Sequence, residues 1–274
     1  MSGKHQNSPD RIAIHTGNLL NFNTLKIRAG QTPKDELLES LNLVILKPET
    51  RKTTENVIQV DGGSPLDGVD DPEERKDLKT SLKLFLPSFK PEAMHEALQS
   101  ALGALGSHTV DSLVIAYNDR NGTKNFLSNL EALWKISEEY VQNGKILRIG
   151  LCDLDTEDFI TFYNNVAIKP SIVQINLSAC CVVPPQLQEF TKQHDIQLLT
   201  HNDPLDILTD ELFSQLFKST GIECRASLSW VVRYQIHVKC RGVLCSKGYF
   251  ISAQKSSLLL VHLLIILLRF FTQT

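Results

Sequence analysis

Five short apolar segments, each followed by a helical segment, constrain the fold of this chain more than any other feature. Each segment is rich in Leu, Ile or Val without polar alternation, which is typical of a strand covered on both faces. They recur about every 25 to 33 residues, so we expect parallel pairing with right-handed crossovers. The segments are LKLFL (82–86), LVIAY (113–117), ILRIGL (146–151), IVQINL (172–177) and IQLLT (196–200).

Three further segments bring the number of predicted strands to eight: IAIH (12–15), NVIQV (56–60) and GVLC (242–245). Residues 32–48 are predicted as the helix after the first strand, because their apolar residues share one face and two prolines bound them. No GxGxxG or GxxxxGK[ST] loop follows a strand, which weakens an open nucleotide-binding sheet as the alternative. We therefore predict an α/β protein, a (β/α)8 TIM barrel.

The chain is predicted to hold one barrel over residues 1–255 and an apolar tail over 256–274. Residues 61–77 form an acidic, turn-rich loop within the barrel. The segment 256–271 is strongly apolar, but His262 and Arg269 interrupt it. Its longest uncharged stretch is shorter than the ~20 residues that span a bilayer. A tail anchor, a buried helix and a stretch foreign to the fold remain open for it; otherwise no membrane association is expected.

Charge and cysteine content narrow the possible functions and compartments. The net charge is −3 and no dense Lys/Arg run occurs, so we expect no nucleic-acid partner. The polar N-terminus lacks the apolar core of a secretory signal. Six cysteines are present without a CxxC pair, and reduced thiols in the cytoplasm are the expectation.

In a barrel of this kind, the functional residues lie at the carboxyl ends of the strands. In this chain many polar side chains are expected there. We expect no metal site, because neither HxH nor HExxH occurs. A cysteine nucleophile is an alternative, with His201 as the base for Cys180. The purely structural interpretation of HNDP (201–204) is that the side chains of Asn202 and Asp203 cap the next helix. The residues at these ends are Asp61, Lys83, Tyr117, Asn118, Asp119, Cys152, Asp153, Ser178 to Cys181, His201, Asn202, Asp203, Cys245, Ser246 and Lys247.

Four long segments resemble the aldo-keto reductase family: residues 105–119, 130–159, 169–178 and 188–204. The resemblance implies the reductase barrel, whose members use Asp, Tyr, Lys and His, with Tyr as the proton donor. Lys83 matches the family's lysine, whereas its histidine position is Ala116. The family's Tyr follows the second strand, and this chain has no Tyr before Tyr117. The general acid of carbonyl reduction is therefore missing, and we expect no catalytic residue here.

More specific strings resemble one branch of this superfamily, the modifier (regulatory) subunits of glutamate–cysteine ligase. They are HTGNLLNF (15–22), NLSACCVVPP (176–185), FTKQHDIQLLTHNDP (190–204) and RGVLCSKGY (241–249). The resemblance implies a non-catalytic protein of glutathione biosynthesis that forms a heterodimer with the catalytic subunit, improves its use of glutamate and relieves inhibition by glutathione. That family ends shortly after a segment like 247–255, without an apolar tail.

Two alternative functions would retain the reductase pocket. One is an active reductase, which the missing Tyr argues against. The other is a pseudo-reductase that retains NADP(H) as a sensing ligand; no cofactor is otherwise required. Lys83, Gln174 and Lys247 could serve such a pocket, Gln174 because it matches the reductases' carboxamide-contacting glutamine. Against it, the reductases' Ser-Asn is replaced by Cys152–Asp153.

Cys180 and Cys181 are the leading candidates for contact with the partner. Adjacent residues of an extended segment point to opposite sides, so one thiol is expected to be core and the other to face the rim. The thiol that faces the rim comes just before the predicted helix start at Pro184–Pro185, and a helix N-terminus stabilises a nearby thiolate. Because the pair lies in a string typical of the regulatory subunits, we predict an intersubunit disulfide, with Cys245 as the second candidate and Cys152 as core.

Overall fold

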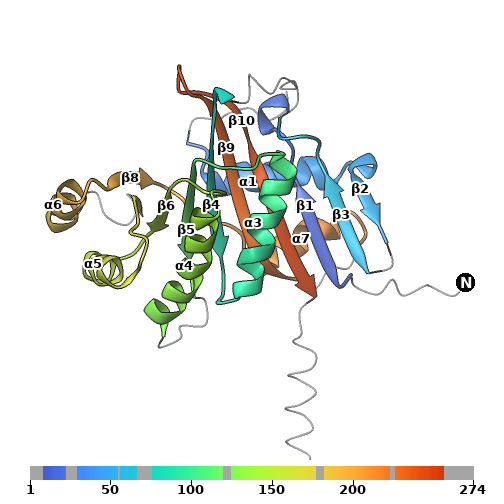
Figure 1. Ribbon diagram of the computed structural model, residues 1–274. Helices are drawn as coiled ribbons and strands as arrows, with labels where there is room; N and C mark the ends of the chain where they lie inside the picture. The colour runs from blue at the N-terminus through green and yellow to red at the C-terminus, as the bar shows by residue number, and fades with distance from the viewer. Residues whose placement is uncertain are drawn as a thin grey trace, which may run out of the picture.

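One ten-stranded sheet organises the protein. The computed structural model describes residues 9–22, 30–54, 56–66, 76–119, 125–176, 182–222 and 226–255. The strands lie in the order β2-β3-β1-β10-β9-β4-β5-β6-β7-β8 (Figure 1). Their bounds are β1 Arg11–His15, β2 Arg51–Thr53, β3 Val57–Asp61, β4 Leu78–Leu86, β5 Ser112–Tyr117, β6 Ile149–Cys152, β7 Ile172–Asn176, β8 Gln197–His201, β9 Ala226–Val238 and β10 Val243–Lys255.

The predicted strands all occur, and the parallel pairing of the five main ones is confirmed. β4 to β8 pair in chain order, each parallel to the next. β1 and β3 form a second parallel pair, to which the short β2 adds an antiparallel edge. The crossover between successive strands of the larger parallel group is a helix in each case.

A long antiparallel hairpin, β9–β10, joins the two parallel groups. β9 lies antiparallel to β4, and β10 lies antiparallel to β1. The sequence analysis predicted only the first residues of β10 and did not predict β9. The signal was present, because Val232, Tyr234 and Ile236 are buried and alternate with the polar Arg233 and Gln235. Such alternation is typical of a strand with one apolar face.

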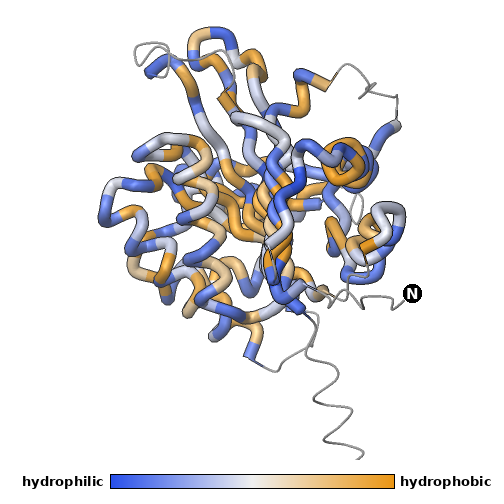
Figure 2. Tube along the Cα trace, turned by 90° about the vertical axis from the view of Figure 1, so that its right-hand side faces the viewer, coloured by the Kyte–Doolittle hydropathy of each residue, from blue (hydrophilic) through white to orange (hydrophobic). Residues whose placement is uncertain are grey.

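Helices cover both faces of this sheet (Figure 1). One face packs against α3 (Pro91–Leu105), α4 (Phe126–Gln142), α5 (Thr156–Asn165) and α6 (Pro185–Gln193). The other face packs, over β3, β1, β10 and β9, against α1 (Pro33–Ile45) and α7 (Asp210–Lys218). Two 3-10 turns, η1 (Leu19–Asn21) and η2 (Pro48–Thr50), complete the described elements. Figure 2 shows the hydrophobic segments gathered along the sheet and the inward sides of the helices.

Helix α1 forms where the sequence predicts it. The Thr32 side chain accepts a hydrogen bond from the Asp35 amide, and the Asp35 carboxylate accepts one from the Thr32 amide. This capping box and Pro33 at the first helical position fix the start of the helix. Leu37, Leu41 and Ile45 are fully buried on the predicted apolar face.

The predicted fold class is confirmed: the protein is an α/β protein of the TIM-barrel type with one mostly parallel ten-stranded sheet. β2 and β8 lie at its two ends, and among the described strands each pairs with one neighbour only. Helices α1 and α7 pack on the opposite face of the sheet from α3 to α6. On that opposite face of β5 to β7, the buried apolar cluster of the described residues consists of Val114, Cys152 and Ile172 and includes no helical residue.

Several predicted features fall outside the described residues. These include Ser178, Cys180, Cys181, most of the acidic loop at 61–77 and the apolar tail over 256–274. Within the part of the chain that the structure describes, no helix has the length and apolar character needed to cross a membrane.

Gly17 marks a close approach between the ends of β1, β3 and β10. Its φ of +67° lies in the left-handed region, and a Cβ there would lie 2.3 Å from the carbonyl oxygen of Gly62. The Gly17 carbonyl in turn accepts a hydrogen bond of 2.8 Å from Tyr234 on β9. Only a residue without a side chain fits this crossing, which explains the glycine in the string HTGN.

We predict that Gly17→Ala lowers the free energy of unfolding by about 1–3 kcal/mol, because the added methyl group collides with backbone and the φ is unfavourable. Urea unfolding would measure the change. The matched control is Gly103→Ala in α3, where an added Cβ meets nothing within 4 Å and the helix gains up to ~1 kcal/mol. Equal destabilisation by both variants would contradict the close approach described here.

Candidate functional site

Six polar side chains from distant parts of the chain meet near the carboxyl ends of β6 and β8. Lys83 of β4 and Arg233 of β9 are direct partners across the antiparallel pairing, so their side chains lie on the same face. The ends of β6 and β8 bring the remaining groups to the same place. We refer to the whole set as the Asp203 cluster: Lys83, Cys152, Asp153, His201, Asp203 and Arg233.

The Asp203 carboxylate is the centre of this cluster. Lys83 Nζ donates to its Oδ2 over 2.7 Å, and Arg233 donates to both carboxylate oxygens. The Lys83 and Asp203 side chains are only 6% and 3% exposed. Burial raises the pKa of the Asp203 carboxyl, but hydrogen bonds from His201 and Arg233 and the charge of Lys83 hold it far below its usual range. Asp203 is therefore ionised and is the shared counter-charge of Lys83 and Arg233.

His201 lies between two carboxylates and a thiol. Its Nε2 is 2.9 Å from Asp153 Oδ1 and 3.1 Å from Cys152 Sγ. Its Nδ1 is 3.3 Å from Asp203 Oδ2. Burial lowers the pKa of the imidazole, but the hydrogen bonds to Asp153, Asp203 and Cys152 outweigh this and raise it to about 10. The ring is thus protonated near neutral pH and is not poised as a general base.

A polar hollow, called here the cationic hollow, lies beside the cluster and is lined by residues of β4, β5, β7, β8 and β9. Among the described residues that line it, the charged ones are all cationic: Lys79, Lys83, Arg148 and Arg233. The amides of Gln174, Gln197 and Gln235 also line it. Gln174 Oε1 is buried and has no hydrogen-bond partner among the described residues. This composition suits an anionic ligand.

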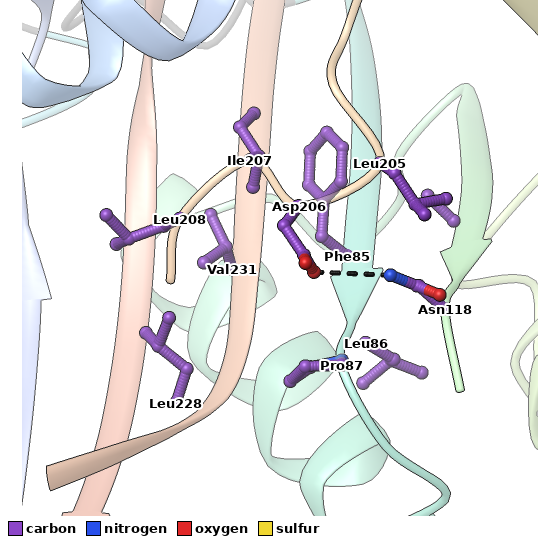
Figure 3. Close-up of a pocket in the computed structure, with 11 residues that line it drawn as sticks. Phe85, Leu86, Pro87, Asn118, Leu205, Asp206, Ile207, Leu208, Leu228 and Val231 are labelled. Carbon is purple, nitrogen blue, oxygen red and sulfur yellow. Dashed lines mark hydrogen bonds between the residues drawn. The ribbon is translucent and has the colours of Figure 1, made fainter. Parts of the chain in front are cut away.

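A second pocket, of about 310 Å³, lies at the ends of β4 and β5 and is mainly apolar (Figure 3). Phe85, Ile207 and Val231 contribute to its wall, and Leu205 at its edge is 71% exposed. Its polar feature is the hydrogen bond of 3.2 Å from Asn118 Nδ2 to Asp206 Oδ1. This pocket therefore differs from the cationic hollow, because its lining is mainly apolar and that of the hollow is polar and positively charged.

The structure brings together two of the three residues predicted for a residual reductase pocket. Lys83 and Gln174 both line the cationic hollow. Lys247 does not line it; its ammonium group pairs with Glu36 of α1. Asp61, at the end of β3, lies beside His15 and four places away from β4 in the strand order.

The cysteine predictions have mixed outcomes. Cys180 and Cys181 lie outside the described residues, so the structure does not test them. Cys245 is half-buried, donates a hydrogen bond to the Ile236 carbonyl, and has a pKa raised by burial. Cys152 is buried, as predicted for a core residue, but its thiol also touches His201 and Asp153.

The interpretation of HNDP as a helix cap is wrong for Asp203. Helix α7 is capped instead by Thr209, whose side chain accepts from the Leu212 amide. Asp203 is drawn inward because Lys83 and Arg233 would otherwise be buried without a counter-charge. We did not predict Arg233 as a site residue, because it lies in β9, which was not predicted as a strand. The signal available in the sequence was a charged residue at one of the alternating polar positions of that strand.

The residues that correspond to the reductase machinery, and the tyrosines nearby, are engaged in contacts within the fold. Lys83, which matches the reductases' lysine, is paired with Asp203 instead of a tyrosine. Tyr117 hydrogen-bonds with Asn129 and stacks on Phe126, while Tyr249 is fully buried. What the cluster does provide is a rigid connection between β4, β9 and the loop after β8.

We predict that Asp203→Asn lowers the free energy of unfolding by about 3–5 kcal/mol, because it leaves two buried cations without their counter-charge. Thermal or urea unfolding would measure the loss. The control is Asp10→Asn, which breaks an exposed pair with Lys255 and should cost less than about 1 kcal/mol. If both variants lose the same small amount, the cluster does not hold the fold as described.

Comparison with known proteins identifies the family. The model of the aldo/keto reductase family matches residues 63–205. The glutamate–cysteine ligase regulatory subunits of Bos taurus and Homo sapiens are each 33% identical to this chain over 255 residues, which cover 89% of it and 93% of them. A putative regulatory subunit from Schizosaccharomyces pombe is 31% identical over 44% of this chain and 42% of its own. The chain therefore belongs to the glutamate–cysteine ligase regulatory subunits, a branch of the aldo/keto reductase family.

Proposed function

We propose that this protein binds the catalytic subunit of glutamate–cysteine ligase as a cytoplasmic heterodimer and activates it for glutathione synthesis. The observation that carries the proposal is the 33% identity over 89% of the chain to proteins named as regulatory subunits of that enzyme. Activation requires that the protein bind one conformation of its partner more tightly than another. The expected consequences are better use of glutamate and weaker inhibition by glutathione.

The Asp203 cluster supports a non-catalytic role. The lysine that would tune a catalytic tyrosine is occupied by a carboxylate, and the imidazole beside it is protonated. The same groups fasten the two parts of the sheet to each other. These features fit a reductase framework that serves as a rigid binding partner.

We predict that adding this protein to the catalytic subunit forms a one-to-one complex and lowers the apparent KM for glutamate or raises the inhibition constant for glutathione. Size-exclusion chromatography and steady-state ligase kinetics would measure the two effects. The control is the catalytic subunit with an unrelated protein of equal concentration. A complex without a change in either constant would indicate a scaffold, and failure to form a complex would contradict the proposal.

The same complex tests the predicted intersubunit disulfide. We propose that one thiol of the Cys180–Cys181 pair forms it under oxidising conditions and that assembly does not require it. A non-reducing gel would compare the unmodified protein with the Cys180→Ser, Cys181→Ser and double variants, with Cys245→Ser as the second candidate. A cross-linked band that persists in the double variant would remove the pair from the interface.

The cationic hollow favours a second candidate function, the binding of NADP(H) as a sensing ligand. Lys83 and Gln174 lie there together, and Arg148 and Lys79 add positive charge suited to phosphate groups. We predict that calorimetry detects NADPH binding that Arg148→Gln weakens, whereas Lys135→Gln on the exposed side of α4 does not. Neither protein should oxidise NADPH in the presence of aldehydes. Absence of heat at millimolar NADPH would exclude this candidate, and aldehyde-dependent turnover would overturn the regulatory role.

A further inference from the structure

Three side chains of the Asp203 cluster form a triangle of metal-ligating atoms. Cys152 Sγ, Asp153 and His201 Nε2 offer one sulfur, one oxygen and one nitrogen. Sγ lies 3.1 Å from Nε2 and 3.1 Å from Asp153 Oδ2, and Nε2 lies 2.9 Å from Asp153 Oδ1. No fold rule requires a thiol, a carboxylate and an imidazole to converge in this way.

The spacing of the three atoms is close to that of a tetrahedral zinc site. Zinc bonds of roughly 2.0–2.3 Å place neighbouring ligand atoms about 3.3–3.6 Å apart. The three contacts are each about half an ångström shorter than this spacing, and the candidate ligand atoms all lie within 4.8 Å of one another. Because the two Asp153 contacts use different carboxylate oxygens, the Asp153 side chain has to rotate to direct one oxygen at the metal. Asp153, whose side chain is 31% exposed, is the ligand with most room to move.

The backbone and the surrounding charges hold the triangle in position. Asp153 has a φ of 57°, and its amide donates to the Gln174 carbonyl over 2.9 Å, so this left-handed turn is anchored to β7. On the other side of the imidazole, Nδ1 accepts a hydrogen bond of 3.1 Å from the Asp203 backbone amide and lies 3.3 Å from Asp203 Oδ2. These contacts hold the ring with Nε2 directed toward Cys152 and Asp153. Asp203 is also the shared counter-charge of Lys83 and Arg233, which reduces their repulsion of a cation.

We propose that Cys152, Asp153 and His201 bind a zinc ion, with the fourth position open to water or to an external ligand. The mixture of a thiolate, an imidazole and a carboxylate favours zinc over magnesium or calcium, which prefer oxygen ligands alone. Binding displaces the thiol proton of Cys152 and the Nε2 proton of His201 into solvent. The proposal departs from our sequence-based expectation of no metal site, which considered HxH and HExxH spacings within single segments.

The test titrates the purified full chain with zinc in competition with a chelator of known affinity, and with cobalt as a spectroscopic probe. We expect one zinc per chain and a thiolate-to-cobalt charge-transfer band. Cys152→Ser should abolish the band and weaken zinc binding at least ~100-fold, and His201→Gln should weaken it similarly, since each removes a direct ligand. Matched controls are Cys240→Ser and Cys245→Ser, which should retain both signals.

Circular dichroism of each variant separates loss of a ligand from loss of the fold. Asp153→Asn, which preserves a residue tolerant of the left-handed turn, provides a third ligand variant that is expected to fold. Zinc affinity unchanged in folded Cys152→Ser and His201→Gln would overturn the proposal. A charge-transfer band lost in Cys240→Ser or Cys245→Ser instead would place the metal elsewhere, and no zinc binding in the unmodified chain would also overturn it.

Discussion

The buried carboxylate of Asp203 is the interaction on which the inner face of the sheet depends. Lys83 and Arg233 belong to adjacent antiparallel strands, and placing two cations side by side there is unfavourable without a counter-charge. Asp203 supplies that charge from a loop that follows β8, at the far end of the strand order. The same carboxylate fixes the imidazole of His201. One side chain thus connects the edge of the parallel group to the hairpin at the centre.

The hairpin joins the two parallel groups of strands into one sheet. β9–β10 lies between β1 and β4 in the strand order, and α1 and α7 pack over it on one face. In a closed barrel the residues that face inward are sealed and mainly apolar. On the corresponding face of β4, β7 and β9 this chain carries Lys83, Gln174 and Arg233, which line the cationic hollow. The hollow therefore depends on residues from both the parallel group and the hairpin.

Local patterns in the sequence predicted eight of the ten described strands and most helices, because each depends on nearby residues. The run LVIAY became β5, and the capping residues Thr32 and Asp35 began α1. The strand order was not predictable in the same way. The place of β9–β10 between β1 and β4 depends on pairing between residues far apart in the sequence, which local patterns do not show. The site shows the same division: Lys83 was named from its strand end, but Asp203 and Arg233 gain their roles only from contacts 120 and 30 residues apart.

The position of β10 has a consequence for how the chain can fold during synthesis. β1, near the start of the described residues, finds one of its two partners in β3 but the other only in β10, more than 200 residues later. β4 likewise has as one of its two neighbours the strand β9, which is synthesised much later. The parallel groups that emerge first from the ribosome each present an unpaired strand edge until the hairpin arrives. The centre of the sheet is therefore the last part to form. Until β9–β10 has been synthesised, the edges of β1 and β4 are exposed without their partner strands.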